Sequence, residues 1–194
     1  NFQKPDKILL QKATDFHGQF EFKPLEPGFG QTIGNSLRRI LLSSLEGYAI
    51  SAIRIAGVDH EFSSIPGVVE DVVDIILNIK QIRLKSAVKG DKATEHQIYI
   101  TISGQDEFRA KDIESRTNMF KVMNPELLIC KMEPSVNLEL EMTITKGRGY
   151  VPAEENMPEN APIGVIPVDA IYTPLKKVSY HVSNTRVGQR TDYE

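Results

Sequence analysis

The sequence has 194 residues, 40% of them hydrophobic and 25% charged, and this composition excludes a disordered or fibrous protein while allowing a hydrophobic core without disulfides. The formal net charge of −3, with no concentrated basic segment, argues against direct binding of DNA or RNA, because most nucleic-acid affinity comes from neutralising phosphates. The single cysteine, Cys130, excludes a disulfide framework, and no apolar run is long enough to cross a membrane, so we expect a cytoplasmic protein without a membrane partner.

The amino-terminal part of the chain predicts two strands. Residues 8–12 are rich in apolar side chains, and within residues 19–25 the side chains of Phe20 and Phe22 alternate with polar ones, which is the period of a strand with one buried face. Residues 15–18 supply the turn between the two strands. We therefore expect a hairpin at the start of the chain.

A helix is predicted next, with Thr32 as its N-cap and Gly47 near its carboxyl end. Three glycines precede or open it: Gly28, Gly30 and Gly34. Their spacing is one residue longer than the dinucleotide-binding fingerprint, and no Gly-Lys-Ser/Thr follows as in a phosphate loop. We interpret the glycines as allowing a tight turn and a close approach of the backbone, with a nucleotide site as the alternative.

The predicted helix is apolar over too wide an arc for one contact. At about 100° per residue its apolar residues cover roughly 200°, whereas one stripe facing a core needs little more than about 100°. The arc is formed by Ile33, Leu37, Ile40, Leu41, Leu42 and Leu45. Either the helix is fully buried in its own domain, or one sector packs there while the rest meets a second chain, with Arg39 and Leu42 presented to a partner. Arg38 points into the apolar arc.

A strand over residues 48–58 and a second helix over residues 68–80 follow, and this helix is also apolar over a wide arc. Two such helices favour a component of an assembly. The acidic residues Glu70, Asp71 and Asp74 lie at its start, where we favour complementation of the helix dipole over a cation site. Lys80, in the last turn, suits either the dipole or a partner contact.

The remainder of the chain predicts mainly strands. Residues 97–103, 127–132 and 136–145 alternate or are β-rich, residues 151–164 hold three prolines and predict an exposed loop, and residues 178–183 alternate again as a last strand. The order of elements indicates an α+β fold with a β-rich insertion.

Catalytic and cofactor-binding groups are not evident in the sequence. The four histidines, at positions 17, 60, 96 and 181, are scattered, with no pair at metal-ligand spacing. No arrangement of nucleophile, base and acid emerges from the spacing. We predict neither an enzymatic activity nor a cofactor or metal for this chain.

Five segments together resemble the amino-terminal domain of the alpha subunit of bacterial-type DNA-directed RNA polymerase. They occur in the order of that family and cover about a third of the chain. The segments are "LEPGFGQTIGNSLRRILLSS", "VEDVVDIILNIK", "GRGYVPA", "PIGVIPVDAIYTPLKKVSYHV" and "RVGQRTDYE".

The resemblance implies a discontinuous dimerisation subdomain, made of an antiparallel sheet and a helix from residues 1–47 and 174–194, and a β-rich insert subdomain, residues 48–173. It implies a non-catalytic scaffold that forms a homodimer and then recruits the β and β′ subunits for transcription. By position, the residues expected to contact β are Arg39 and Leu42. Those expected to contact β′ are Lys80, Val168 and Leu175. Those expected at the dimer interface are Phe29, Ile33, Leu37 and Ile40.

The family continues past "QRTD" into a long helix and a DNA-binding carboxy-terminal domain. We therefore expect this chain to be a fragment that is monomeric or weakly dimeric and does not bind DNA. Two alternatives stay open on the sequence: a nucleotide-binding enzyme using the glycine turn, and a free-standing protein-interaction adaptor of similar fold.

Overall fold

The computed structural model describes residues 4–14 and 17–194, and the chain divides into two compact units. The first unit holds the chain up to residue 42 together with residues 177–194, and the second holds residues 43–176. The sequence-based boundaries lay after residues 47 and 173. The predicted α+β class is confirmed by the mixture of helices and antiparallel strands. The predicted turn at 15–18 lies partly outside the described residues.

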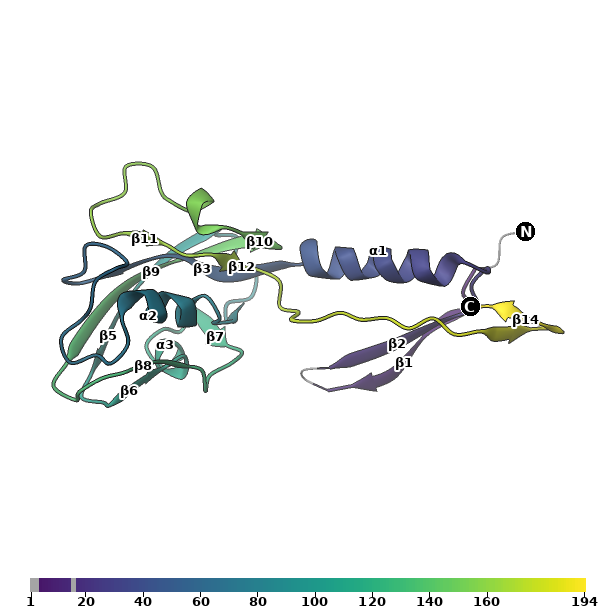
Figure 1. Ribbon diagram of the computed structural model, residues 1–194, viewed down its shortest axis with the longest axis horizontal. Helices are drawn as coiled ribbons and strands as arrows, with labels where there is room; N and C mark the ends of the chain where they lie inside the picture. The colour runs from purple at the N-terminus through teal and green to yellow at the C-terminus, as the bar shows by residue number, and fades with distance from the viewer. Residues whose placement is uncertain (1–3, 15–16) are drawn as a thin grey trace. The chain divides into compact units, whose positions relative to one another are not determined.

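The first unit contains two hairpins and one long helix (Figure 1). Strands β1 (Lys7–Ala13) and β2 (Gly18–Lys23) pair antiparallel with a register shift between Leu10 and Lys12, so the predicted hairpin is confirmed. Helix α1 follows, and the sequence did not predict the second hairpin. The bounds of these elements are Phe29–Ser43 for α1, Thr185–Val187 for β13 and Arg190–Tyr193 for β14.

The ends of α1 differ from the sequence-based expectation. Thr32 lies inside the helix and does not cap it. The first free N–H groups are bound instead by the side chain of Glu194, whose carboxylate accepts hydrogen bonds from Gly28 N at 2.9 Å and Gly30 N at 2.7 Å. A carboxylate is favoured there because the helix amino terminus carries unpaired donors and a partial positive charge. Gly47 does not end the helix, because it already belongs to the following strand.

The predicted strand over residues 178–183 is wrong, because this segment pairs with no strand in the described residues 4–14 and 17–194. It runs beside α1 (Figure 1), with Tyr180 over Gly34 and Val182 over Gly30. A Cβ atom at Gly34 would overlap the Tyr180 ring, and one at Gly30 would lie 2.7 Å from Val182 Cγ1. Four helical residues rise about 6 Å and two extended residues about 6.6 Å, so every second side chain of the segment meets every fourth residue of the helix.

The second unit is built on an antiparallel sheet whose strand order is β5-β9-β3-β4-β7, with β11 also pairing with β3. The predicted strands over residues 48–58, 97–103 and 136–145 are confirmed as β3, β5 and β9. The strand bounds are Glu46–Ile55 for β3, Leu84–Ser86 for β4, Glu95–Ser103 for β5, Phe120–Val122 for β7, Asn137–Arg148 for β9 and Ile166–Pro167 for β11.

Shorter elements complete the second unit. Strand β8 confirms the strand predicted over 127–132, and the predicted loop at 151–164 contains a short 3-10 helix, Ala153–Glu155. The other bounds are Val72–Ile79 for α2, Lys111–Glu114 for α3, Glu107–Arg109 for β6, Leu128–Lys131 for β8, Tyr150–Val151 for β10 and Ala170–Ile171 for β12.

Helix α2 begins at Val72, four residues later than predicted. The residues before it are used by β8: Val69 N donates to Lys131 O at 2.9 Å, and Lys131 N donates to Glu70 Oε2 at 2.7 Å. These bonds tie Val69 and Glu70 to β8, so this stretch does not form a helical turn. The carboxylate of Glu70 therefore binds a strand end.

The hydrophobic core of the second unit lies between α2 and the sheet (Figure 1). Val72, Ile75 and Ile79 of α2 are fully buried, as are Met142 and Ile144 of β9. The period of two is clear at the start of β9, where Asn137 and Glu139 are exposed between buried neighbours, but further along Thr143 is buried as well. The second unit thus has a large core of its own.

Candidate protein-protein interfaces

The first unit buries little of its apolar surface. Among the residues whose burial the structure describes, Leu25 and Gly30 are its buried residues. On the β1–β2 hairpin, Ile8, Leu10 and Phe20 are about 60% exposed, and the pairing of Leu10 with Phe20 places all three on one face. Exposing such an apolar face to water is unfavourable in free energy.

Helix α1 also exposes apolar side chains. Phe29 is 41% exposed and Ile40 is 53% exposed, while Ile33 and Leu37 are half-buried. At about 100° per residue, these four residues lie within roughly 80° of one another. We call this surface the apolar face of α1. The interpretation of the helix as fully buried in its own domain is wrong, because Gly30 is its only buried residue.

Arg39 and Leu42 lie on a different side of α1, roughly 150° from the centre of the apolar face. Arg39 is exposed and Leu42 is half-buried. We call this surface the Arg39 face. The third side of the helix carries Gly30, Gly34 and Arg38 and is covered by residues 178–182, with Arg38 Nε donating to Val178 O at 3.0 Å. The two neighbouring arginines therefore have different surroundings.

The residues expected at a β′ contact lie in the second unit. Lys80 follows α2, and its Nζ lies 3.6 Å from Asp169 Oδ2. Val168 is fully buried in the core, so its side chain cannot reach a partner in this structure. Its neighbour Asp169 and Leu175 are half-buried. The structure thus joins Lys80 to Asp169, whereas Val168 supports this surface from inside.

Sequence reasoning missed a pocket beside Lys80. Arg83 Nη1 donates to Lys80 O at 3.2 Å, and Arg83, Asn124 and Lys176 line the pocket, whose volume is about 340 Å³. These residues come from three segments that are far apart in the chain. No periodicity or spacing in the sequence brings them together, so only the fold reveals the pocket.

Reactive groups are scarce in the part of the chain that the structure describes. Burial, with a smaller contribution from the negative charge of Glu70, raises the pKa of the Cys130 thiol to about 12, so the thiol is neutral near pH 7. No cluster of three or more His, Cys, Asp or Glu side chains suited to a metal occurs in this part. None of its helices is both long and apolar enough to span a membrane.

The fold defines a class of protein in which a β-rich insert with its own core interrupts a smaller α+β unit that exposes apolar surface. Residues 53–173 match the family model for the RNA polymerase Rpb3/RpoA insert domain. This match covers more than half of the chain, and the chain belongs to that family. The resemblance on which the sequence analysis relied is confirmed.

Several proteins named DNA-directed RNA polymerase subunit alpha are similar to this chain over almost all of its length. The DNA-directed RNA polymerase subunit alpha of Flavobacterium psychrophilum is 57% identical, and that of Cytophaga hutchinsonii is 58% identical, each over 100% of this chain and 58% of the relative. The subunit alpha of Salinibacter ruber is 46% identical over 99% of this chain. The chain thus spans a little over half the length of the curated relatives it matches.

Proposed function

We propose that this chain is a non-catalytic assembly scaffold of DNA-directed RNA polymerase. In this proposal the first unit, described in the sequence analysis as the dimerisation subdomain, pairs with a second copy of the chain. The dimer then binds the β and β′ subunits. The observation that carries the proposal is the exposed apolar surface of the first unit, on the β1–β2 hairpin and on α1.

An exposed apolar surface of this kind is typical of a protein–protein interface. Phe29 and Ile40 are part of a continuous helical face rather than isolated side chains, and a second copy offers the same face for a symmetric contact. The Arg39 face points to another side of the helix, so it stays available when the apolar face is covered. Arginine is enriched among the residues that contribute most to the binding energy of interfaces.

The relatives named above support the assignment of partners. Their name places them in DNA-directed RNA polymerase, and their sequences align with this chain over its full length. We assign Arg39 and Leu42 to β, the surface of Lys80 and Leu175 to β′, and Phe29, Ile33, Leu37 and Ile40 to the dimer. In this proposal, catalysis belongs to the large subunits.

The test is co-expression of a tagged chain with the β and β′ subunits of the same genome, followed by affinity purification and size-exclusion chromatography. We expect both large subunits to elute with the chain in a complex containing two copies of it. Recovery of the chain alone, with both large subunits present and folded in the lysate, would overturn the proposal and favour an adaptor for a different assembly.

A further inference from the structure

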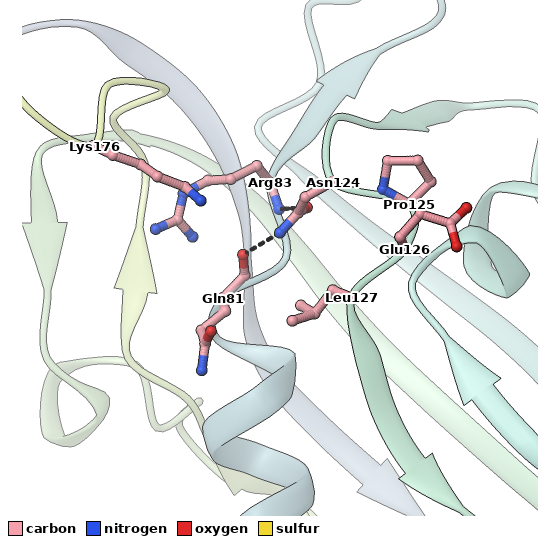
Figure 2. Close-up of a pocket in the computed structure, with 7 residues that line it drawn as sticks. All are labelled: Gln81, Arg83, Asn124, Pro125, Glu126, Leu127 and Lys176. Atoms are coloured by element: carbon pink, nitrogen blue, oxygen red, sulfur yellow. Dashed lines mark hydrogen bonds between the residues drawn. The ribbon is translucent and has the colours of Figure 1, made fainter. Parts of the chain in front are cut away.

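The pocket beside Lys80 has a rigid frame on one side (Figure 2). Asn124 Oδ1 accepts a hydrogen bond from Arg83 N at 2.9 Å, and Asn124 Nδ2 donates to Gln81 O at 2.8 Å. Met123 N donates to Arg83 O at 2.8 Å. These bonds fix the backbone from which Arg83 enters the pocket, so the guanidinium is held near its place before any ligand arrives.

Two cationic side chains line this pocket without a carboxylate partner among the described residues. Figure 2 draws the Arg83 guanidinium and the Lys176 amine on the same side of the pocket. Glu126 is the one acidic residue in the lining, and its carboxylate points to the other side in Figure 2. Of the five N–H groups of Arg83, Nη1 binds Lys80 O, whereas Nε is buried and has no hydrogen-bond partner.

This arrangement is costly for the free protein. Burial without a counter-charge lowers the pKa of Arg83 below its usual value. A second positive charge in the same pocket adds repulsion, and an unpaired buried donor loses its bonds to water. An anionic group placed between the two side chains would offset the unpaired charge of Arg83 and the repulsion from Lys176, and a planar carboxylate matches the fork of a guanidinium.

We propose that this pocket receives an aspartate or glutamate side chain of the large subunit that binds beside Lys80. This inference rests on the proposed function, because it takes the β′ subunit as the owner of that side chain. Pro125 and Leu127 form an apolar wall of the pocket, against which the methylene groups of the acidic residue pack. Lys80 is already engaged by Asp169, so Arg83 and Lys176 are the cations that this carboxylate meets.

The test measures the affinity of β′ for the complex of this chain with β, at low and at high salt. The variants are Lys176→Gln, Arg83→Gln and Arg83→Lys, with Lys85→Gln as the matched control. Lys85 is an exposed cation two residues from Arg83 that does not line the pocket. Thermal melting of each chain alone shows whether it is folded.

We expect Lys176→Gln and Arg83→Gln each to weaken β′ binding about 10- to 30-fold at low salt, and by a smaller factor at high salt. Lys85→Gln should bind β′ as the wild type does, and Arg83→Lys should have an intermediate affinity. Lys176 is exposed, so its variant keeps the test open if an Arg83 variant fails to fold. Normal β′ binding by the folded Lys176→Gln variant would overturn the proposed role of the pocket but not the proposed scaffold function. A wild-type chain that binds neither large subunit would overturn both.

Discussion

At the scale of single residues, Arg38 and Arg39 are the clearest pair for comparison. They are adjacent and chemically identical, and both are exposed. Arg38 donates to the Val178 carbonyl of its own unit, whereas Arg39 lies on the face assigned to β. The helical step of about 100° between them directs one guanidinium to the extended segment of residues 178–182 and the other to the Arg39 face.

We expect Arg38→Ala to lower the free energy of unfolding by about 1 kcal/mol, because a charge-assisted hydrogen bond and the packing of its stem are lost. Arg39→Ala should change stability by less than about 0.5 kcal/mol and weaken β capture by about thirtyfold. Thermal melts and β pull-downs on each single variant measure both effects. A lowered melting temperature of Arg39→Ala, or normal β capture by it, would show that the faces of α1 have been assigned to the wrong contacts.

Cys130 provides a second test at this scale. Its pKa is about 12 in the folded chain and near 9 in an unfolded one. Below pH 9 both states hold the proton, so the thiol has no effect there. Between pH 9 and 12 only the unfolded state ionises, so stability should fall by about 1.4 kcal/mol per pH unit from this group.

Unfolding curves for the wild-type chain and for Cys130→Ala, at pH 9, 10 and 11, isolate this contribution, because other titrating groups are shared. The wild-type free energy of unfolding should fall more steeply than that of the variant. Parallel slopes would mean that Cys130 is accessible to water in the native state.

At the scale of elements, the helix α1 is held by the far end of the chain. Glu194 binds the first N–H groups of the helix, and its backbone pairs in both directions with Leu25. Residues 178–182 then cover the face of Gly30 and Gly34. The helix and the extended segment therefore depend on each other, although neither is recognisable as the other's partner in the sequence.

Glu194→Ala should lower the unfolding free energy of the first unit by about 1 kcal/mol, the usual cost of losing a helix cap. Glu194→Gln should cost less, because the amide oxygen can still accept one of the two bonds. Hydrogen exchange of the amides at residues 28–31 measures the effect locally. A matched control is Glu159→Ala, an exposed acidic residue in the loop of the second unit. Equal exchange in all variants would rule out the cap.

At the scale of the whole molecule, the two units differ in how they are stabilised. The second unit has an extensive core of isoleucine, valine, leucine and phenylalanine side chains. The first unit exposes Ile8, Phe20 and Ile40 by more than half of their surface. Within this chain, the first unit therefore buries much less apolar surface than the second unit does.

Ile40→Glu should raise the dissociation constant for self-association at least about tenfold, because a charge replaces an apolar side chain in the proposed dimer contact. Ile163→Glu is the control, since Ile163 is 82% exposed in the second unit, outside that contact. Sedimentation across a concentration series measures both. An unchanged constant for Ile40→Glu, or an equal effect of Ile163→Glu, would place the dimer contact elsewhere.

Periodicity predicted the longer elements correctly, because strands such as β5 and β9 and the helix α1 extend over enough residues to show the period of their own backbone, whereas short elements such as α3, β4 and β7 were not predicted. It failed at 178–183, where a strand-like alternation packs on a helix. It also failed at the boundaries of α1 and α2, where Glu194 and Lys131 supply bonds from distant parts of the chain. Those partners have no local signal.

The sequence by itself determined the α+β class and the wide apolar arc of α1, because both are carried by residue type at short, regular spacing, and the five segments that resemble the alpha subunit identified the family. Only the tertiary structure decided how that arc divides into the apolar face, the Arg39 face and the side covered by residues 178–182. It also decided that Val168 is internal and that Arg83 and Lys176 share a pocket. The physical reason is that burial and charge environment depend on segments that meet only after folding, and local spacing does not encode which segments meet.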